Sequence, residues 1–310
     1  MSKKIIFMGT PLFSVPILKS LFKSGYTISA VYTQPPKKSH RGQSFHKSPI
    51  QNIAEELNID FRSPQTLKDN DKEYEFLRKL NSDLAIVVAY GQIIPKKFLN
   101  LTKKGFINIH ASILPKWRGA APIQRSIINL DEETGISIMK INEELDSGPI
   151  SNIYKIKLDQ NLNAMEVSEM LSLLAADKIL ENVEDIFDGK SNFIDQDHSK
   201  ASYAKKIAKS EGQIDWNENA LRIIGKINGF YPSPGAFFVF NGERYKILKA
   251  EISSGIGKNG EVIGDNLEIA CGNKKSIKII EIQREGKKAQ KIEEFLLGSQ
   301  IKKGSKIFNV

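Results

Sequence analysis

Hydrophobic and polar positions in the first half of the chain follow two alternating patterns. Short continuous apolar runs predict buried strands at residues 3–8, 26–32, 84–89, 105–110 and 135–141. Between them, apolar positions recur every three or four residues, which predicts helices at 12–23, 49–57 and 71–80, the second one capped by Ser48. Strands that alternate with helices are typical of a doubly wound α/β domain with a mostly parallel sheet.

The pattern changes in the second half. Helical spacing with room for a break midway covers residues 162–187, and a polar stretch at 189–211 predicts a linker. A short helix at 217–228 then precedes strand-like runs at 236–240, 244–250, 260–263, 267–270 and 276–282. Short strands divided by Gly and Asn turns predict a small β-barrel. The predicted division is therefore an α/β domain at 1–188, a linker at 189–211 and a β domain at 212–310.

Composition narrows the class of protein. The chain has 310 residues, of which 40% are apolar and 26% are charged, and this excludes a disordered chain or a coiled-coil rod. The longest apolar run, 84–90, is far shorter than the roughly 20 residues of a membrane span. Cys271 is the single cysteine, so no internal disulfide forms, and without a targeting signal we expect a cytoplasmic protein. The four histidines show no metal-ligand spacing, so no metal is expected.

Positive charge is concentrated in the N-terminal half. The net charge is +9, and residues 1–54 and 84–130 contain 8 and 7 basic residues without a single acidic one. One interpretation is chance composition with solvated lysines. The other is an anionic partner, either a nucleic acid or a substrate that carries phosphate.

The segment with the most chemistry begins at the end of the predicted strand 105–110. Asn108 and His110 are two residues apart, so both side chains leave the same face of that strand, while Ile107 and Ile109 occupy the other face. A structural, hydrogen-bonded histidine is one interpretation of His110. The other is catalytic, because an amide NH2 and an imidazolium both donate hydrogen bonds and together suit an oxyanion that forms on a carbonyl.

A histidine in such a role needs an acid that orients it or balances its charge. The candidate is Asp146, in a turn between two strands, although Asp-Ser-Gly is also ordinary turn chemistry. Glu143 and Glu144 are alternative acids. Gly9-Thr-Pro11 after the first strand lacks the glycine spacing of a dinucleotide or nucleoside triphosphate loop.

Several motifs together resemble one family. They are Asn108-Ile-His-Ala-Ser-Ile-Leu-Pro115, Trp117-Arg-Gly-Ala-Ala-Pro-Ile-Gln124 and Leu145-Asp-Ser-Gly148, with Gly9-Thr-Pro11, Thr33-Gln-Pro35, Val87-Val-Ala-Tyr-Gly91, Ile214-Asp-Trp216 and Gly286-Lys-Lys288 elsewhere. The sequence resembles the formyltetrahydrofolate-dependent transferases, and within them the methionyl-tRNA formyltransferase family. The match runs along almost the whole chain.

The resemblance implies a fold and a reaction. The expected fold is a Rossmann-like formyltransferase domain, a linker and an OB-like tRNA-binding barrel. The expected reaction moves a formyl group from the co-substrate 10-formyltetrahydrofolate to the α-amino group of methionyl initiator tRNA, for translation initiation. By resemblance the catalytic residues are Asn108, His110 and Asp146. The residues that bind the folate are, again by resemblance, Ser112, Ile113, Leu114 and Pro115, with Val88, Tyr90 and Gly91 near the pterin.

The resemblance also gives the basic residues a partner. Arg41 matches a loop arginine that probes the end of the acceptor stem, and Gln43-Ser-Phe45 stands where the family often has two lysines. Phosphate contacts are therefore assigned to Lys37, Lys38 and Lys47 in the loop, and to Lys205, Lys206 and Lys209 in the linker. A solvated surface is the alternative for all of these lysines.

Three functions remain open at this point. The first is the tRNA formyltransferase, and the second is a formyltransferase for a small amine, such as an amino sugar or glycinamide ribonucleotide, which has no obvious need for a basic loop or a barrel. The third is an RNA-binding protein without catalysis. Retention of Asn108, His110 and Asp146 argues against the third. Neither a membrane nor an obligate protein partner is expected.

Overall fold

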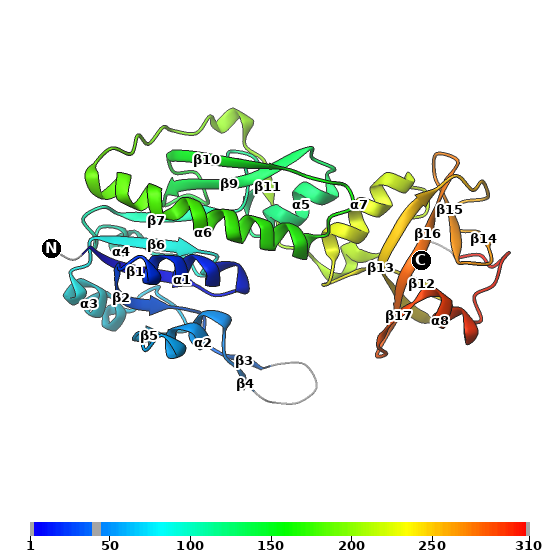
Figure 1. Cartoon of the computed structure of the whole chain (residues 1–310), viewed down its shortest axis with the longest axis horizontal. Helices are drawn as coiled ribbons and strands as arrows, with labels where there is room; N and C mark the ends of the chain where they lie inside the picture. The colour runs from blue at the N-terminus through cyan, green and yellow to red at the C-terminus, as the bar shows by residue number, and fades with distance from the viewer. Residues whose placement is uncertain (1–2, 39–44, 308–310) are drawn as a thin grey trace. The chain divides into compact units, whose positions relative to one another are not determined.

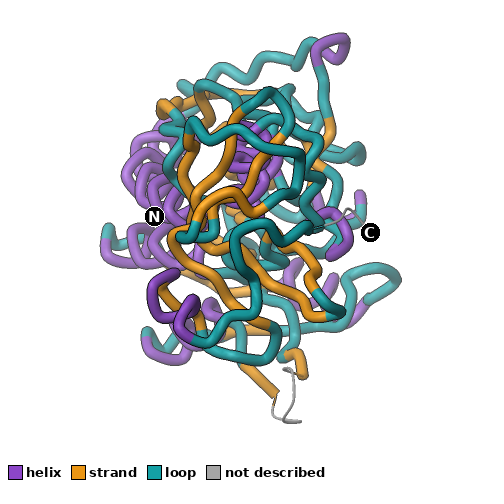
Figure 2. The backbone as a smooth tube through the Cα atoms, turned by 90° about the vertical axis from the view of Figure 1, so that its right-hand side faces the viewer, coloured by secondary structure: helices purple, strands orange, loops and turns teal. Residues whose placement is uncertain are grey.

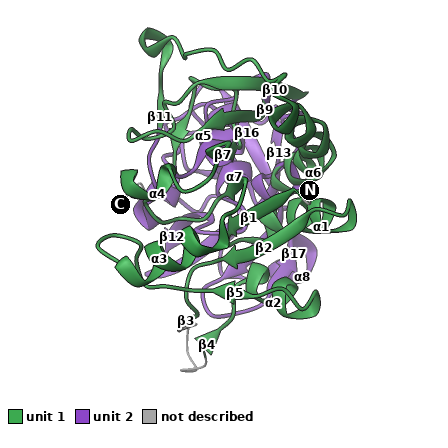
Figure 3. Cartoon of the chain, turned by 90° about the vertical axis from the view of Figure 1, so that its left-hand side faces the viewer, with its two compact units in different colours: residues 1–119, 135–156, 168–203 green, residues 120–134, 157–167, 204–310 purple. Residues whose placement is uncertain are grey.

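The structure, a computed structural model, describes residues 3–38 and 45–307. The chain divides into two units, each assembled from several segments (Figure 3). Unit 1 contains residues 1–119, 135–156 and 168–203, and unit 2 contains 120–134, 157–167 and 204–310. The division at 188/189 and 211/212 that the sequence suggests stays a prediction.

A seven-stranded sheet organises unit 1, in the order β10-β9-β7-β6-β1-β2-β5 (Figure 1). The strands are β1 (Lys4–Gly9), β2 (Thr27–Tyr32), β5 (Phe61–Arg62), β6 (Leu84–Val88), β7 (Phe106–His110), β9 (Glu133–Lys140) and β10 (Ile150–Lys157). Parallel pairs join β5, β2, β1, β6 and β7, whereas β9 runs antiparallel to β7. The predicted mostly parallel α/β sheet is thus confirmed.

Helices cover both faces of this sheet, as continuous apolar strands require. The side chains of Ile6, Met8, Ala85 and Val87 lie in one buried cluster with residues of α3 (Asp71–Leu80) and α4 (Lys96–Leu99). α1 (Val15–Lys23) and α6 (Ala164–Asp188) run side by side (Figure 1), joined by a hydrogen bond of 2.8 Å from the Ser20 hydroxyl to a carbonyl of α6.

Several predicted elements of unit 1 match the structure closely. The helix expected at 71–80 is α3, and the Ser48 hydroxyl accepts a hydrogen bond from the Gln51 amide, so it caps α2 (Pro49–Glu56). α6 is one unbroken helix of 25 residues, without the break that the spacing allowed. The described part of residues 33–48 contains two paired two-residue strands, β3 (Lys37–Lys38) and β4 (Phe45–His46).

Unit 2 is built on an antiparallel sheet in the order β12-β13-β16-β15-β14, with β17 beside β16. These strands are β12 (Ala236–Phe240), β13 (Glu243–Ser253), β14 (Val262–Gly264), β15 (Glu268–Cys271), β16 (Lys275–Arg284) and β17 (Ala289–Lys291). Turns and loops join them (Figure 2). Five of the six lie where the sequence predicts strands, and the OB-like barrel stays a prediction.

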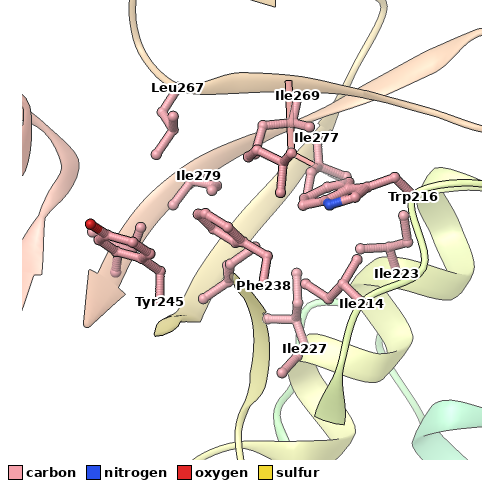
Figure 4. Packing of buried hydrophobic residues seen from close by; sticks show 14 of the residues in the cluster. Ile214, Trp216, Ile223, Ile227, Phe238, Tyr245, Leu267, Ile269, Ile277 and Ile279 are labelled. Carbon is pink, nitrogen blue, oxygen red and sulfur yellow. The ribbon is translucent and has the colours of Figure 1, made fainter. Parts of the chain in front are cut away.

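The core of unit 2 forms between this sheet and α7 (Ala220–Phe230). Trp216, Phe238 and Tyr245 pack ring against ring among buried isoleucines (Figure 4). Full burial of each such side chain contributes roughly 1.5–3 kcal/mol. Cys271 is buried in β15, and burial raises the pKa of its thiol to about 12, so it is an unreactive core residue.

Unit 2 also contains two helices that the sequence patterns do not reveal. These are α5 (Pro122–Ile128) and α8 (Ile292–Leu297). α5 approaches α7 so closely that a Cβ on Gly229 would lie 2.4 Å from the Ile128 side chain. Within the described ranges, no helix is both long enough and apolar enough to cross a membrane.

Candidate active site

Strand β7 places two of the predicted catalytic residues. Its neighbours β6 and β9 pair with it on both sides, and Asn108 lies between Val87 of β6 and Met139 of β9. Because side chains alternate along a strand, Asn108 and His110 leave one face together. His110 is only 6% exposed, so its ring must find polar partners inside the protein.

The structure brings Asp146 to this pair. Its Oδ1 accepts a hydrogen bond of 3.3 Å from the Asn108 Nδ2, and its Oδ2 lies 3.6 Å from the His110 Nδ1. The same Oδ2 accepts a shorter bond of 2.8 Å from the backbone amide of Gly119. All three predicted catalytic side chains therefore meet around one carboxylate.

The contact of Nε2, the other nitrogen of the His110 ring, shows that this nitrogen carries a hydrogen. Nε2 lies 2.9 Å from the backbone carbonyl oxygen of Trp117, and a carbonyl only accepts, so Nε2 carries a hydrogen and donates it. Nδ1 is the ring nitrogen that faces the Asp146 carboxylate. The geometry is thus that of an oriented histidine–aspartate pair.

Trp117, whose carbonyl contacts the His110 ring, and Asp146 itself both have left-handed backbones. Trp117 has φ of 64° and Asp146 has φ of 47°, and such a backbone strains any residue other than glycine. Asparagine and aspartate bear this conformation better than bulky residues do. The strain occurs where the Trp117 carbonyl meets His110 and where the Asp146 carboxylate turns towards Asn108.

The loop that carries Asp146 is held tightly against β9. The Lys140 amide donates to the Pro149 carbonyl at 2.9 Å, and a Cβ on Gly148 would lie 1.9 Å from the Lys140 carbonyl oxygen. Only glycine allows so close an approach. The Asp-Ser-Gly sequence therefore forms the turn and also places the Asp146 carboxylate in the site.

The alternative acids do not reach the histidine. Glu143 is exposed and forms an ion pair of 2.5 Å with Lys96, and Glu144 is exposed as well. The structure thus favours Asp146, as the sequence analysis did.

The segment predicted to bind the folate chain contains both supporting and accessible residues. The Ser112 hydroxyl donates to the Lys116 carbonyl at 2.6 Å, and Ser112 and Leu114 are buried. Ile113 and Pro115 are half-buried and therefore better placed to touch a ligand. The buried hydroxyl of Ser137 on β9 donates to the Ser112 carbonyl and accepts from the Leu114 amide, a support that the sequence analysis missed.

The loop predicted to lie near the pterin follows β6. The Val88 carbonyl accepts from the Ser14 hydroxyl at 2.7 Å, and the Tyr90 carbonyl accepts from Thr10 and Gln34. The Gly91 carbonyl also accepts from Gln34, at 2.8 Å. Each carbonyl has two lone pairs, so that of the exposed Gly91 keeps one for a ligand, whereas Val88 is fully buried.

Alanine at Gly91 is expected to distort this loop. Gly91 has φ of 79°, which strains any other residue, and an added Cβ would lie 2.2 Å from the Gln34 Nε2, so the Gln34 side chain must move from its hydrogen bonds to the Tyr90 and Gly91 carbonyls. We expect Gly91→Ala to raise KM for the formyl donor about tenfold, or roughly 1.4 kcal/mol, with a much smaller change in kcat. Gly25→Ala is the matched control, because Gly25 has φ of 83° with no atom within 4 Å of the added Cβ. Equal KM values for the two variants would contradict a folate-binding role for the loop.

Four of the residues predicted to bind tRNA belong to the N-terminal loop, and the structure adds little evidence for that role. Arg41 lies outside the described residues, and Lys37 and Lys38 form β3. Lys47 forms an ion pair of 2.7 Å with Glu55, and hydrogen bonds from Lys47 and Gln51 lower the pKa of that carboxyl.

The predicted linker carries the other three lysines, Lys205, Lys206 and Lys209, and all three are exposed. The backbone under them is fixed. The Arg125 guanidinium donates to the Lys205 carbonyl and pairs with Glu211 at 2.6 Å, and this lowers the pKa of the Glu211 carboxyl. Within unit 2 this segment is therefore an ordered basic strip, which we call the 205–209 strip.

Residues outside the predicted set also support the site. The Trp117 carbonyl, the Gly119 amide and the Gln196 side chain all contact the catalytic group or its backbone. Trp117 and Gly119 lie in a motif that the sequence analysis quoted without a role. Gln196 comes from a polar stretch with no periodicity, so nothing in its sequence context marked it. Among the described residues, no cluster of three or more His, Cys, Asp or Glu side chains suits a metal ion.

Comparison with known proteins identifies the family of this chain. The family model described as "Formyl transferase" matches residues 3–182, and "Formyl transferase, C-terminal domain" matches residues 206–300. The chain therefore belongs to the formyltransferase family. Within it, the relatives place the chain among the methionyl-tRNA formyltransferases: it is 68% identical to a protein of that name from Pelagibacter ubique, over all of both chains. A second methionyl-tRNA formyltransferase, from Chelativorans sp., is 40% identical over 99% of this chain and 100% of its own.

Solved structures share the fold at lower identity. An N-formyltransferase from Helicobacter canadensis, in complex with folinic acid and dTDP-3-aminofucose, superposes with a TM-score of 0.70 at 20% identity. The alignment covers 92% of this chain and 100% of that one. This similarity supports the two-part fold.

Proposed function

We propose that the protein transfers the formyl group of 10-formyltetrahydrofolate to the α-amino group of methionyl initiator tRNA, a step of translation initiation. The observation that carries this proposal is the convergence of Asn108, His110 and Asp146 in a chain so similar to methionyl-tRNA formyltransferases. The proposed place of action is the cytoplasm.

The side chains present suit a carbonyl oxygen that gains negative charge. Asn108 has two N–H groups and uses one of them on Asp146, so the other is available to a substrate oxygen. When the amine of methionine attacks the formyl carbon, a C–N bond forms and the formyl oxygen becomes an oxyanion. Asn108 donates to that oxygen, and the His110 Nε2–H moves to it from the Trp117 carbonyl. A well-placed donor of this kind contributes about 3–4 kcal/mol to the transition state.

Asp146 has two tasks in this scheme. Its carboxylate balances the charge of the protonated imidazole, and it fixes the direction of the Asn108 amide. The attacking amine must then lose a proton, and the nitrogen of the folate must gain one as its bond to the formyl carbon breaks. Protonated His110 gives its proton to that folate nitrogen, and the neutral imidazole then takes the proton that the amine loses.

The proposed folate site is formed by the 88–91 and 112–115 loops. When bound there, 10-formyltetrahydrofolate supplies an activated formyl group. Ile113, Pro115 and the Gly91 carbonyl are the groups placed to hold it. Val88 and Tyr90 are buried, and their carbonyls order the loop by accepting from Ser14, Thr10 and Gln34.

A basic face on unit 2 supports a tRNA partner. Cross-strand pairing places Phe237 opposite Lys246 and Val239 opposite Arg244, so these side chains share one face of β12 and β13. The Arg244 guanidinium stacks on the Phe237 ring at 3.6 Å. Burial, Arg244 and Lys209 all lower the pKa of Lys246, so this face lies within electrostatic reach of the 205–209 strip. Clustered cations suit the phosphates of RNA.

Loss of this basic face is expected to weaken tRNA binding without affecting catalysis. The double variant Arg244→Ala/Lys246→Ala should bind tRNA about tenfold more weakly at physiological salt, and the slope of log K against log salt should fall by about 1–2. Titration with labelled tRNA at several salt concentrations measures both. Lys278→Ala is the control, because Lys278 of the same sheet pairs with Glu251. An unchanged salt slope in the double variant would argue against this surface.

One assay separates the proposed function from its alternatives. Purified protein is given 10-formyltetrahydrofolate with either charged initiator tRNA or nucleotide-linked amino sugars. We expect formyl transfer to the tRNA alone. Transfer to the amino sugars alone would favour a small-amine formyltransferase, and tRNA binding with no transfer at all would favour an RNA-binding protein.

A further inference from the structure

Arg118 is a buried cation next to the candidate active site. Its side chain is 2% exposed, and its guanidinium donates to the Gln196 Oε1 from Nε at 3.1 Å and from Nη2 at 2.7 Å. Its Nη1 lies 3.4 Å from the His198 Nδ1. Burial of a charge is costly, so an arginine in this place requires hydrogen-bond acceptors around its guanidinium.

Gln196 links this arginine to the loop that carries the catalytic carboxylate. Its Nε2 donates to the Asp146 carbonyl at 2.9 Å and to the Gly148 carbonyl at 2.7 Å. The orientation of the amide is therefore fixed at both ends, because the guanidinium can only donate and the two carbonyls can only accept. Gln196 is itself 6% exposed, so water competes little for these bonds.

The bonds from Gln196 act on a strained backbone. Asp146 has the left-handed φ of 47°, a strained conformation that persists only when its surroundings hold it. The carbonyls of Asp146 and Gly148 lie on either side of Ser147, so Gln196 clamps the turn by one hydrogen bond on each side of that residue. This clamp holds the Asp146 carboxylate near Asn108 and His110.

Arg118 also supports the histidine–aspartate pair through the backbone on both sides of it. The adjacent Gly119 amide donates to the Asp146 Oδ2, and the adjacent Trp117 carbonyl accepts from His110. The Arg118 amide donates to the Ser202 carbonyl at 2.8 Å, so the 117–119 segment is fixed at its centre by both backbone and side chain. Arg118 thus orients Gln196 and anchors the segment that contacts both members of the histidine–aspartate pair.

We infer that Gln196 and Arg118 are positioning residues for formyl transfer, which hold the Asp146 carboxylate in its catalytic orientation through hydrogen bonds to the backbone on both sides of Ser147. The inference rests on the proposed function, since it concerns the same reaction. It also gives the polar stretch after α6 a role beyond that of a linker, because residues 196–202 support the site.

Gln196→Glu tests the inference with the least damage to folding. The carboxylate still accepts from Arg118, but it cannot donate to the Asp146 and Gly148 carbonyls. We expect kcat to fall about 10- to 100-fold, as for a reacting group displaced by about 1 Å, with KM for both substrates within about twofold. Gln196→Ala should show the same split between kcat and KM. A kcat within about twofold of the parent in Gln196→Glu would overturn the inference.

A double-mutant cycle with Asp146→Asn shows whether the effect passes through the carboxylate. If Gln196 acts by positioning Asp146, adding Gln196→Glu to Asp146→Asn should lower single-turnover rates by less than about twofold. Multiplied losses in the double variant would overturn the inference in favour of a general structural role.

Asn182→Ala is the matched control for the loss of a buried amide. Asn182 is 2% exposed in α6 and donates to the Tyr154 hydroxyl and the Lys178 carbonyl, away from the site. It should lower the melting temperature with kcat unchanged, and a kcat loss matching that of Gln196→Glu would overturn the inference. The parent protein separates the two claims: failure of the parent to formylate tRNA refutes the proposed function, whereas an active parent with normal Gln196 variants refutes only the positioning role.

Discussion

Replacement of His110 with alanine is expected to lower kcat for formyl transfer about 10³-fold, within the range for loss of a proton-transfer group or an oxyanion donor. The ring is buried, oriented by the Trp117 carbonyl through Nε2, and faces the Asp146 carboxylate through Nδ1. Alanine removes both the donor to the oxyanion and the group that moves the proton. Single-turnover formylation of charged tRNA measures the loss.

The same variant should bind tRNA with an affinity within about twofold of the parent, because His110 is buried in the site and is not one of the basic residues assigned to RNA binding. Loss of one hydrogen bond to the Trp117 carbonyl should cost about 1 kcal/mol of folding stability, so the protein remains folded. Turnover within a few fold of the parent would contradict the proposed role of His110.

Asp146→Asn should be comparably severe, with kcat about 10³- to 10⁴-fold lower and little change in KM. The carboxylate now accepts from Asn108 at one oxygen and from Gly119 at the other, and an amide cannot accept at both ends. The NH2 of the new amide therefore faces either the Asn108 NH2 or the Gly119 N–H, so that two donors meet. The substitution also removes the negative charge opposite His110. Asparagine tolerates the left-handed backbone at this position, so the loop itself should persist.

The neighbouring acids provide the controls for this prediction. Glu143→Gln and Glu144→Gln remove exposed charges from the same loop and should leave kcat within about twofold of the parent. A kcat loss in either that approached the loss in Asp146→Asn would indicate that the loop contributes charge in general and that no single carboxylate is required.

The sequence predicted the parts of the site that depend on local periodicity. Asn108 and His110 share a face because a strand has a period of two, and the apolar residues between them mark the strand as buried. The helix at α3 and the Ser48 cap were equally local features, and the structure confirms both. The resemblance then supplied the catalytic roles, which stay predictions.

The remaining support of the site depends on contacts between distant segments. Gln196 is 50 residues beyond the carbonyl of Asp146 to which it donates, and Arg118 is 78 residues before Gln196. A lone glutamine in a polar stretch carries no periodicity, and an arginine in a motif gives no sign of burial. Ser137 escaped notice for the same reason, because its hydroxyl serves a loop 25 residues away. Such partners become visible only when tertiary structure brings them together.

The interleaving of the two units affects how the chain can be divided. Unit 2 includes α5, which lies in the chain between two segments of unit 1, and α5 packs on α7, which lies about a hundred residues later in the chain. A polypeptide that ends before α7 would leave Ile128 and Leu130 without their packing partner. During synthesis on the ribosome, α5 therefore cannot pack against α7 until residues 220–230 have emerged, and its apolar surface stays accessible to chaperones until then.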